Sequence, residues 1–393
     1  MILLIENQCK GWIHNRVNTG LIKAVRTACP QKTIKLCAEA GHIQGVKELL
    51  SEDGIEIDYE EIEFDDDIKE FDTAKQAYFQ QSDALIKSNS DADVIIFMSC
   101  NKGIVSSCAD ISEKYPDKRF YLTLHTALEE VCYSPSIDIK SNIIRILSAV
   151  KHFRKIERKD EFSMQSCMEK CKEPNCKFII YSPMYKKELK NKLSKRIIDK
   201  IIFLHHPFYD VRAQKNNGNY AGDEKIKVGI YGQALNPHAV EIVKEYNAGF
   251  DNGSVEFQVI VREHPEIAEL KNVKSLFKTP YADNKDLENA INGFDYVLIP
   301  YAYNQYKVTA SGIFCDAISQ EKPAVMLDSP YLKYYNEYKV GILSESVKEA
   351  AEKISKLYED REIIKKIVSS QKKLKKITFE ENIYSIKKEF GEC

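Results

Sequence analysis

Residues 293–328 read GFDYVLIPYAYNQYKVTASGIFCDAISQEKPAVMLD and combine the pattern of two strands with that of one helix. The apolar run at residues 296–299 is followed by a polar loop that ends in the sequence TASG at residues 309–312. A segment with apolar residues at helical spacing comes next, and residues 324–327 form a second apolar run. This order predicts a strand, a loop, a helix and a strand, which is the repeating unit of a parallel sheet covered by helices.

The junction between this loop and this helix has the chemistry of an anion site. Ser311 is a preferred N-cap residue, and Gly312 leaves room for a close approach to the backbone. The first amides of a helix have no partner within the helix, so they and the helix dipole attract phosphate. Asp316 lies one turn further on, where its carboxylate could accept hydrogen bonds from sugar or ribose hydroxyls. A capped helix with a solvated aspartate is the alternative.

The length and composition of the chain fit an ordinary globular protein. Its 393 residues are enough for two domains that each bury a core. Hydrophobic residues make up 44% and charged residues 30%, as in typical soluble domains. A formal net charge of −2 predicts no general attraction to nucleic acid, and the sequence contains no reader motif for it.

The cysteines and the apolar runs of the sequence indicate the cellular compartment of the protein. Eleven cysteines, an odd number, are spread over the chain, which indicates a reducing environment. The apolar start is short, and no run reaches the length of a membrane span, so we predict a cytoplasmic protein. Cys167, Cys171 and Cys176 lack the CxxC pairs and the fourth ligand of a structural zinc site. We therefore predict an irregular loop with incidental thiols here, and no metal site.

Strand-like runs alternate with helical patterns along both halves of the chain, which predicts doubly wound α/β domains with parallel sheets. Residues 211–224 are polar and rich in glycine and asparagine, as expected of a linker. The predicted parts are an N-terminal domain at residues 1–210, this linker, a C-terminal domain at residues 225–375 and a final helix at residues 376–393.

The stretch at residues 293–328 resembles the nucleotide-sugar-binding segment of GT-B glycosyltransferases. In that family a strand, a loop, a glycine-containing turn and an acidic residue precede a Gly-x-Pro-Val sequence at the entry to the next strand. The corresponding residues here are Pro323, Ala324 and Val325, and the glycine is missing. The resemblance covers essentially the whole chain. It implies two Rossmann-like domains that face a cleft, the N-terminal one for the acceptor and the C-terminal one for the donor, and a C-terminal helix that returns to the N-terminal domain.

The same resemblance implies how the donor is bound. The helix N-terminus would hold the diphosphate and the acidic residue the ribose, while the loop after residues 226–231 approaches the phosphates. A cation after the next strand or in the polar loop would offset the charge of the diphosphate leaving group, although an ordinary surface ion pair or a solvated lysine is the alternative for each. The predicted donor-binding residues are Gly232, Gln233, Arg262, Lys307, Thr309, Ser311, Gly312 and Asp316.

One departure from the family pattern leaves the stereochemistry open. Many retaining GT-B enzymes carry two glutamates separated by seven residues. With Asp316 as the second acid, the first position is Val308. Retention and inversion are therefore both compatible with the sequence.

Two histidines are the candidate catalytic residues, and both follow predicted strands of the first domain. His125 and Thr126 resemble the His-Thr strand end of retaining GT-B enzymes, where the imidazole lies near the transferred sugar. A core histidine bonded to the backbone is the alternative. His14 lies in the loop after the first strand, where it could act as the base of an inverting mechanism or bind the acceptor.

The resemblance implies a hexosyltransferase-type glycosyltransferase that moves a sugar from a UDP- or GDP-linked donor, without a further cofactor, to a glycan or lipid-linked acceptor in bacterial surface polysaccharide synthesis. Basic runs at residues 151–159 and 186–196 would allow peripheral contact with an anionic membrane at its inner face, and solvated helix faces explain them as well. One alternative is a sugar-nucleotide epimerase of the same fold, which predicts cleft carboxylates beyond Asp316 and Glu6. Another is a catalytically silent glycosyltransferase-like partner protein.

Overall fold

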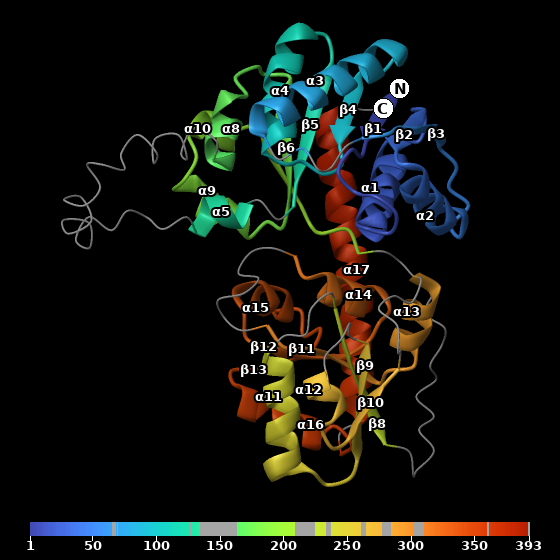
Figure 1. The fold of residues 1–393 in the computed structure, drawn as a ribbon, viewed down its shortest axis with the longest axis vertical. Coiled ribbons are helices and arrows are strands. Elements are labelled where there is room, and N and C mark those ends of the chain that lie inside the picture. The colour runs from blue at the N-terminus through green and yellow to red at the C-terminus, as the bar shows by residue number, and fades with distance from the viewer. Residues whose placement is uncertain are drawn as a thin grey trace, which may run out of the picture. The chain divides into compact units, whose positions relative to one another are not determined.

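The computed structural model describes most of the chain, which divides into two compact units (Figure 1). The first unit comprises Met1–Pro207 and Glu381–Cys393, and the second comprises Phe208–Glu380. The predicted linker at residues 211–224 and the basic run at residues 151–159 lie outside the described residues. The described residues are 1–64, 68, 70–125, 128–133, 163–208, 225–232, 237–260, 265–276, 284–301, 310–359 and 361–391.

The first unit is built on a sheet of seven parallel strands in the order β3-β2-β1-β4-β5-β6-β7. Ile2 and Leu4 belong to a core that includes residues of α1 and α17, while Leu3 and Ile5 are equally buried on the opposite face. The central strands are therefore continuous apolar runs, as expected where both faces are covered. The strands are β1 (Ile2–Ile5), β2 (Ile34–Ala38), β3 (Asp58–Glu61), β4 (Val94–Phe97), β5 (Arg119–Leu124), β6 (Cys176–Tyr181) and β7 (Ile201–Leu204).

Helices join these strands, and several begin with a side-chain cap. Glu39, Asn101 and Ser163 each accept a hydrogen bond from a backbone amide in the first turn of the helix that follows. The strand order reverses between β1 and β4, and ligands of open α/β sheets bind beyond the carboxyl ends at such a point. The helices are α1 (Asn15–Ala28), α2 (Ala40–Ser51), α3 (Phe71–Ser88), α4 (Lys102–Lys114), α5 (Leu128–Tyr133), α8 (Met164–Lys170), α9 (Tyr185–Lys190) and α10 (Lys195–Ile198).

The second unit repeats this design with six parallel strands in the order β10-β9-β8-β11-β12-β13. Its strand order reverses between β8 and β11. The strands are β8 (Ile226–Tyr231), β9 (Val255–Ile260), β10 (Val273–Ser275), β11 (Tyr296–Ile299), β12 (Ala324–Leu327) and β13 (Ile342–Ser344). The helices are α11 (Pro237–Glu245), a π-helical turn (Tyr246–Phe250), α12 (Pro265–Ala268), α13 (Asn284–Asn292), α14 (Gly312–Ser319), α15 (Pro330–Asn336) and α16 (Val347–Ser355).

The last helix, α17 (Arg361–Phe390), contributes to both units. In the second unit, the side-chain amide of Gln371 donates to the carbonyls of Lys322 at 2.9 Å and Val340 at 3.0 Å. In the first unit, the Asn382 side chain forms a two-way pair with the His205 backbone, with distances of 2.7 Å and 2.9 Å. The predicted return of the C-terminal helix to the first domain is therefore confirmed.

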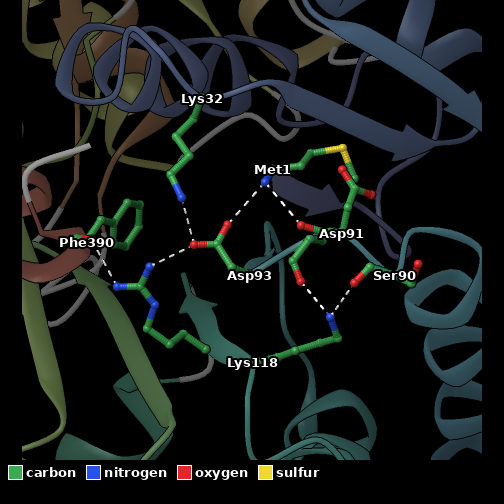
Figure 2. Close-up of polar contacts among 9 residues, drawn as sticks. Met1, Lys32, Ser90, Asp91, Asp93, Lys118 and Phe390 are labelled. Atoms are coloured by element: carbon green, nitrogen blue, oxygen red, sulfur yellow. Dashed lines mark hydrogen bonds and ion pairs between the residues drawn. The ribbon is translucent and has the colours of Figure 1, made fainter.

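A network of charges closes the amino-terminal edge of the first sheet (Figure 2). The Asp93 carboxylate accepts from the amine of Met1 at 3.2 Å, from Lys32 at 2.8 Å and from Arg119 at 3.2 Å. Arg119 also donates to the carbonyl of Phe390, at 3.0 Å. These contacts join the starts of β1, β4 and β5 to the end of α17, at the edge opposite the carboxyl ends of the strands.

Three local predictions need correction. The lysine-rich stretch before residue 376 is not separate from the last helix, because both belong to α17, whose Ile367 and Leu374 are buried. The solvated helix face expected for the basic run at residues 186–196 is divided between two short helices, α9 and α10. The segment that carries the three thiols is not an irregular loop, because α8 buries Met164, Cys167 and Met168 and β6 begins at Cys176.

No group of three or more histidine, cysteine, aspartate or glutamate side chains in the described part of the chain is arranged to hold a metal ion. No helix within it has the length and the apolar character required to cross a membrane.

Candidate functional site

The start of α14 in the second unit is capped as the sequence predicts. Ser311 is fully buried, and its hydroxyl accepts from the amide of Phe314 at 3.2 Å. The two amides before Phe314, those of Gly312 and Ile313, have no partner within the helix itself. Gly312 is exposed, and no atom of the described residues would lie within 4 Å of a β-carbon there. A helix N-terminus of this kind suits an anion.

The end of β8 lies against the same turn of α14. Gly232 has a φ of 140°, and a β-carbon on it would lie 3.1 Å from Cδ1 of Ile313. The hydroxyl of Tyr231, the last residue of β8, donates to the Ile313 carbonyl at 3.3 Å. The structure therefore brings Gly232 beside Ser311 and Gly312, at the carboxyl ends of the two strands where the sheet order reverses.

The other predicted donor residues divide into two groups. Asp316 is half-buried one turn into α14, while Phe314, Ala317 and Ile318 are fully buried, as the helical pattern predicts. The remaining four fall outside the described residues, and they are Gln233, Arg262, Lys307 and Thr309.

In the first unit, a row of rings follows the carboxyl ends of the strands. The rings of His14 and His125 have their centroids 4.8 Å apart, and His125 lies at the same distance from Tyr181. The ring of His206 is 5.4 Å beyond Tyr181. Because these residues follow or end β1, β5, β6 and β7, the row crosses much of the sheet edge. The structure thus brings the two predicted catalytic histidines together.

The proton of the His125 ring can be placed from its partner. Its Nε2 lies 3.3 Å from the carbonyl oxygen of Met98. A carbonyl can only accept, so Nε2 carries the proton and Nδ1 is the free acceptor of the neutral ring. Burial holds the pKa of His125 well below its usual range, with smaller contributions from His14 and His206. His125 is therefore a neutral imidazole at physiological pH.

His14 sits in a fixed but unusual backbone conformation. It occupies the N-cap position of α1 with φ 59° and ψ 10°, a left-handed conformation that a histidine seldom adopts. Its Nδ1 lies 3.4 Å from the sulfur of Cys9. Burial lowers the pKa of His14, and burial together with the charge of Glu6 raises the pKa of Cys9 to about 12. At neutral pH the pair is therefore an uncharged imidazole and a thiol.

Glu6 organises the loop that carries these two residues. It is fully buried directly after β1, and burial raises its pKa. One carboxylate oxygen accepts from the amides of Gln8 at 2.9 Å and Cys9 at 3.0 Å. The other accepts from Asn18 at 2.9 Å and from the hydroxyl of Ser99 at 2.7 Å. Four donors compensate for burial of the carboxylate, and they join the loop to α1 and to the end of β4.

Comparisons with known proteins agree with this architecture. No family model matches the sequence, and no curated protein matches it. HepE of Anabaena, solved in complex with UDP, is 14% identical and matches over 99% of this chain and 98% of its own, with a TM-score of 0.57. The sucrose-phosphate synthase of Thermosynechococcus elongatus is 12% identical over 99% and 98% of the two chains, with a TM-score of 0.62. The chain has the GT-B fold.

A third solved structure belongs to a different class of enzyme. The UDP-GlcNAc 2-epimerase of Neisseria meningitidis, bound to UDP-GlcNAc, is 13% identical over 97% of this chain and 100% of its own, with a TM-score of 0.55. The structures similar to this chain therefore include both transferases and an epimerase. The fold alone does not decide between these activities, so the distinction depends on the residues of the site.

Sequence reasoning did not identify several residues that the structure places at the carboxyl edge of the first sheet. Tyr181 ends β6, Ser99 follows β4 by two residues, and His206 follows β7 by two residues. His42 was not considered, although its Nε2 lies 3.0 Å from the side-chain nitrogen of Asn18. A usable signal was present, because polar residues directly after parallel strands converge on one edge.

Proposed function

We propose that this protein is a glycosyltransferase that takes a sugar from a nucleotide-sugar donor. The observation that carries the proposal is the meeting of Gly232 with the capped, open N-terminus of α14 at the strand reversal of the second sheet. This arrangement offers backbone amides to a diphosphate, at a glycine that no described residue covers. HepE, whose fold is similar, binds UDP and UDP-glucose.

These contacts support a proposed donor site. The amides of Gly312 and Ile313 would bind the diphosphate, and Asp316, one turn on, would accept from a ribose hydroxyl. Arg262 and Lys307 remain the proposed cations for the leaving group, and Gln233 and Thr309 the proposed further contacts. The donor would be UDP- or GDP-linked.

The chemistry of His14 favours binding over strong base catalysis. A histidine that acts as a base is usually oriented by a carboxylate, which also raises its pKa. The polar neighbour of the His14 ring in the described chain is the thiol of Cys9, and burial lowers the pKa of the ring. We therefore propose that neutral His14 and His125 hydrogen-bond the acceptor hydroxyl and the transferred sugar.

The acceptor and the biological setting complete the proposal. A glycan or lipid-linked acceptor, used in the synthesis of a bacterial surface polysaccharide by an enzyme in the cytoplasm or at the inner face of the membrane, fits such a transferase. Contact with an anionic membrane through the basic residues of the first unit belongs to the same proposal.

An epimerase is the second candidate, because one structural neighbour is a UDP-GlcNAc 2-epimerase. Epimerisation needs acid and base groups at the sugar. In the first unit the buried acid at the sheet edge, Glu6, already receives four hydrogen bonds that hold the loop. That use of Glu6 favours the transferase.

The experiment that separates these activities measures nucleotide release from UDP-glucose, UDP-N-acetylglucosamine and GDP-mannose, with and without saccharide acceptors. A transferase releases nucleotide faster when an acceptor is present, and His14→Ala should slow that release. His238→Ala is a matched control, because His238 is a partly exposed residue of α11 paired with Glu241 at 2.7 Å. Conversion of the donor to an epimer without nucleotide release would support the epimerase. If no donor is turned over, the result would support the catalytically silent partner.

A further inference from the structure

The loop between β1 and α1 exposes two large apolar side chains next to each other. Trp12 is 47% exposed and Ile13 is 53% exposed, directly before His14. The other large apolar side chains exposed in the described part of the chain are not adjacent in sequence to these, and they are Tyr358, Phe379 and Tyr384.

The backbone holds this loop in one conformation. The amide of Gly11 donates to Glu39 at 2.9 Å, and the same carboxylate oxygen accepts from the amide of His42 at the start of α2. The amide of Ile13 donates to the Lys10 carbonyl at 3.3 Å. Gly11 has a φ of 52°, which favours glycine at the turn. The exposed side chains therefore stand on a fixed turn.

The indole of Trp12 is fixed as well. A β-carbon on Gly45 of α2 would lie 3.0 Å from Cζ3 of Trp12, so the ring packs where α2 has no side chain. Asn15 packs at the same place, with its Nδ2 only 1.9 Å from that position. Asn15 is 1% exposed, and neither its side-chain nitrogen nor its oxygen has a hydrogen-bond partner in the described structure. A buried amide left unpaired at this loop is costly unless something else pairs with it.

We propose that Trp12 is the stacking platform for a sugar ring of the acceptor, an inference that rests on the proposed transferase function. The face of an indole carries negative charge density and attracts polarised C–H groups such as those on one face of a pyranose. A fixed tryptophan also provides a large contact area at a low cost in conformational entropy. His14, the proposed contact of the acceptor hydroxyl, follows Trp12 by two residues on the same turn.

A saccharide fits this surface better than a lipid bilayer does. Stable interfacial anchoring uses the whole apolar face of an amphipathic helix or two separate anchors. Here the apolar surface is two side chains on one turn, and the helix that follows buries its own apolar residues, including Leu21, Ile22 and Val25, in the core. The acceptor would therefore be recognised through carbohydrate, whether or not it also carries a lipid.

Trp12 is the single tryptophan of the chain, so its fluorescence reports directly on this loop. The experiment titrates the full-length protein, with UDP present, with methyl glycosides and short oligosaccharides of glucose, galactose, mannose and N-acetylglucosamine. We expect a saturable change of emission with at least one of them. By calorimetry, Trp12→Ala should weaken binding of that saccharide at least about tenfold, Trp12→Phe should keep most of it, and Tyr384→Ala, which removes an aromatic residue 70% exposed on α17, should change nothing.

Three results would overturn the inference. In the first, no saccharide changes the fluorescence emission of Trp12. In the second, phosphatidylglycerol vesicles shift this emission but no saccharide does. In the third, the Trp12→Ala variant binds saccharide as tightly as the wild type. Thermal stabilisation by UDP, measured on the same samples, separates this failure from failure of the proposed function. If UDP stabilises the protein and saccharides leave Trp12 unaffected, the transferase proposal stands and the role of Trp12 is wrong.

Discussion

The imidazole rings of His14 and His125 lie 4.8 Å apart, centroid to centroid, although one precedes α1 and the other follows β5. Burial lowers the pKa of both rings. Two neutral imidazoles can share this space without charge repulsion, and each has hydrogen-bonding capacity for a substrate hydroxyl. The same burial means that protonation of either ring works against the folded state.

The first prediction follows for the pH dependence of stability. Burial lowers the pKa of five histidines in the first unit from the usual 6.5. The pKa falls to about 4 for His42 and to about 3 for His206. It is also lowered for His14, His125 and His205. Because the unfolded chain binds these protons more readily, stability should be complete above pH 6.5 and fall as the pH drops toward 4. His42 alone accounts for about 3 kcal/mol, while Glu6, whose pKa is raised, works in the opposite direction.

Trp12 lies in the first unit and gives the signal for this measurement. Denaturant unfolding followed by tryptophan fluorescence over the pH range should show the loss, and His206→Gln should reduce its slope. A stability that stays flat as the pH falls below 6.5 would show that the histidines are not buried in the folded protein.

The second prediction concerns Glu6. In Glu6→Gln, an amide nitrogen replaces one carboxylate oxygen and meets either two backbone amides or the donors of Asn18 and Ser99. Unpaired buried donors cost about 1–3 kcal/mol each, so the first unit should lose about 2 kcal/mol of stability. Glu113→Gln, the same exchange at an exposed position of α4, is the control and should be nearly neutral. An unchanged unfolding midpoint for Glu6→Gln would contradict the role of the carboxylate.

The third prediction concerns Gly232. Alanine there must adopt a φ of 140° and place its β-carbon 3.1 Å from Ile313, so Gly232→Ala should cost about 1–3 kcal/mol. Gly253→Ala has a φ of 78° but open space around the β-carbon, so it tests backbone strain without the contact. Thermal unfolding of both variants gives the comparison. Nucleotide binding should weaken in Gly232→Ala and remain normal in Gly253→Ala.

The fourth prediction concerns the charge network of Figure 2. Partial burial opposes ionisation of Asp93, but Lys32 and the amine of Met1 hold its pKa at about 2. The stabilisation is present above the usual value of 3.8 and is lost as the pH falls toward 2. Because Asp93 is 39% exposed, solvent screens these pairs, and Asp93→Asn should cost only about 1 kcal/mol at neutral pH. High salt should reduce the difference from the wild type, and a difference that does not depend on salt would contradict an electrostatic origin.

The sequence was sufficient to predict the sheet-forming strands, and the reason is visible in β4 and β11. Both are short apolar runs that are fully buried, so a continuous pattern without alternation identifies them. The N-cap at Ser311 was also predictable, because Ser311 directly precedes the apolar helix α14 in the sequence. Local signals of this kind depend on a few consecutive residues.

The ring row and the Glu6 network were not predictable in the same way. His14, His125, Tyr181 and His206 meet only because the parallel register aligns the ends of four strands, and no local pattern states that register. The continuity of α17 was not predicted from its lysine-rich first half, although Gln371 and Leu374 there are fully buried. Burial of one side of a charged helix depends on what packs against it.

The most direct test of the central claim is thermal stabilisation by UDP, GDP, ADP and CMP in the wild type, in Ser311→Ala and in Ser329→Ala. Ser329 is a matched control, because it is also fully buried and caps α15 in the same unit, with its hydroxyl accepting from the amide of Leu332 at 3.3 Å. Each variant should lose about 1 kcal/mol from the missing cap. The account predicts that UDP or GDP at a hundred times its Kd stabilises the wild type and Ser329→Ala by about 2.7 kcal/mol. It stabilises Ser311→Ala much less, because a first turn without its cap no longer fixes the amides of Gly312 and Ile313 toward the diphosphate. Stabilisation of none of the three, or equal stabilisation of all three, would contradict a nucleotide site at the start of α14.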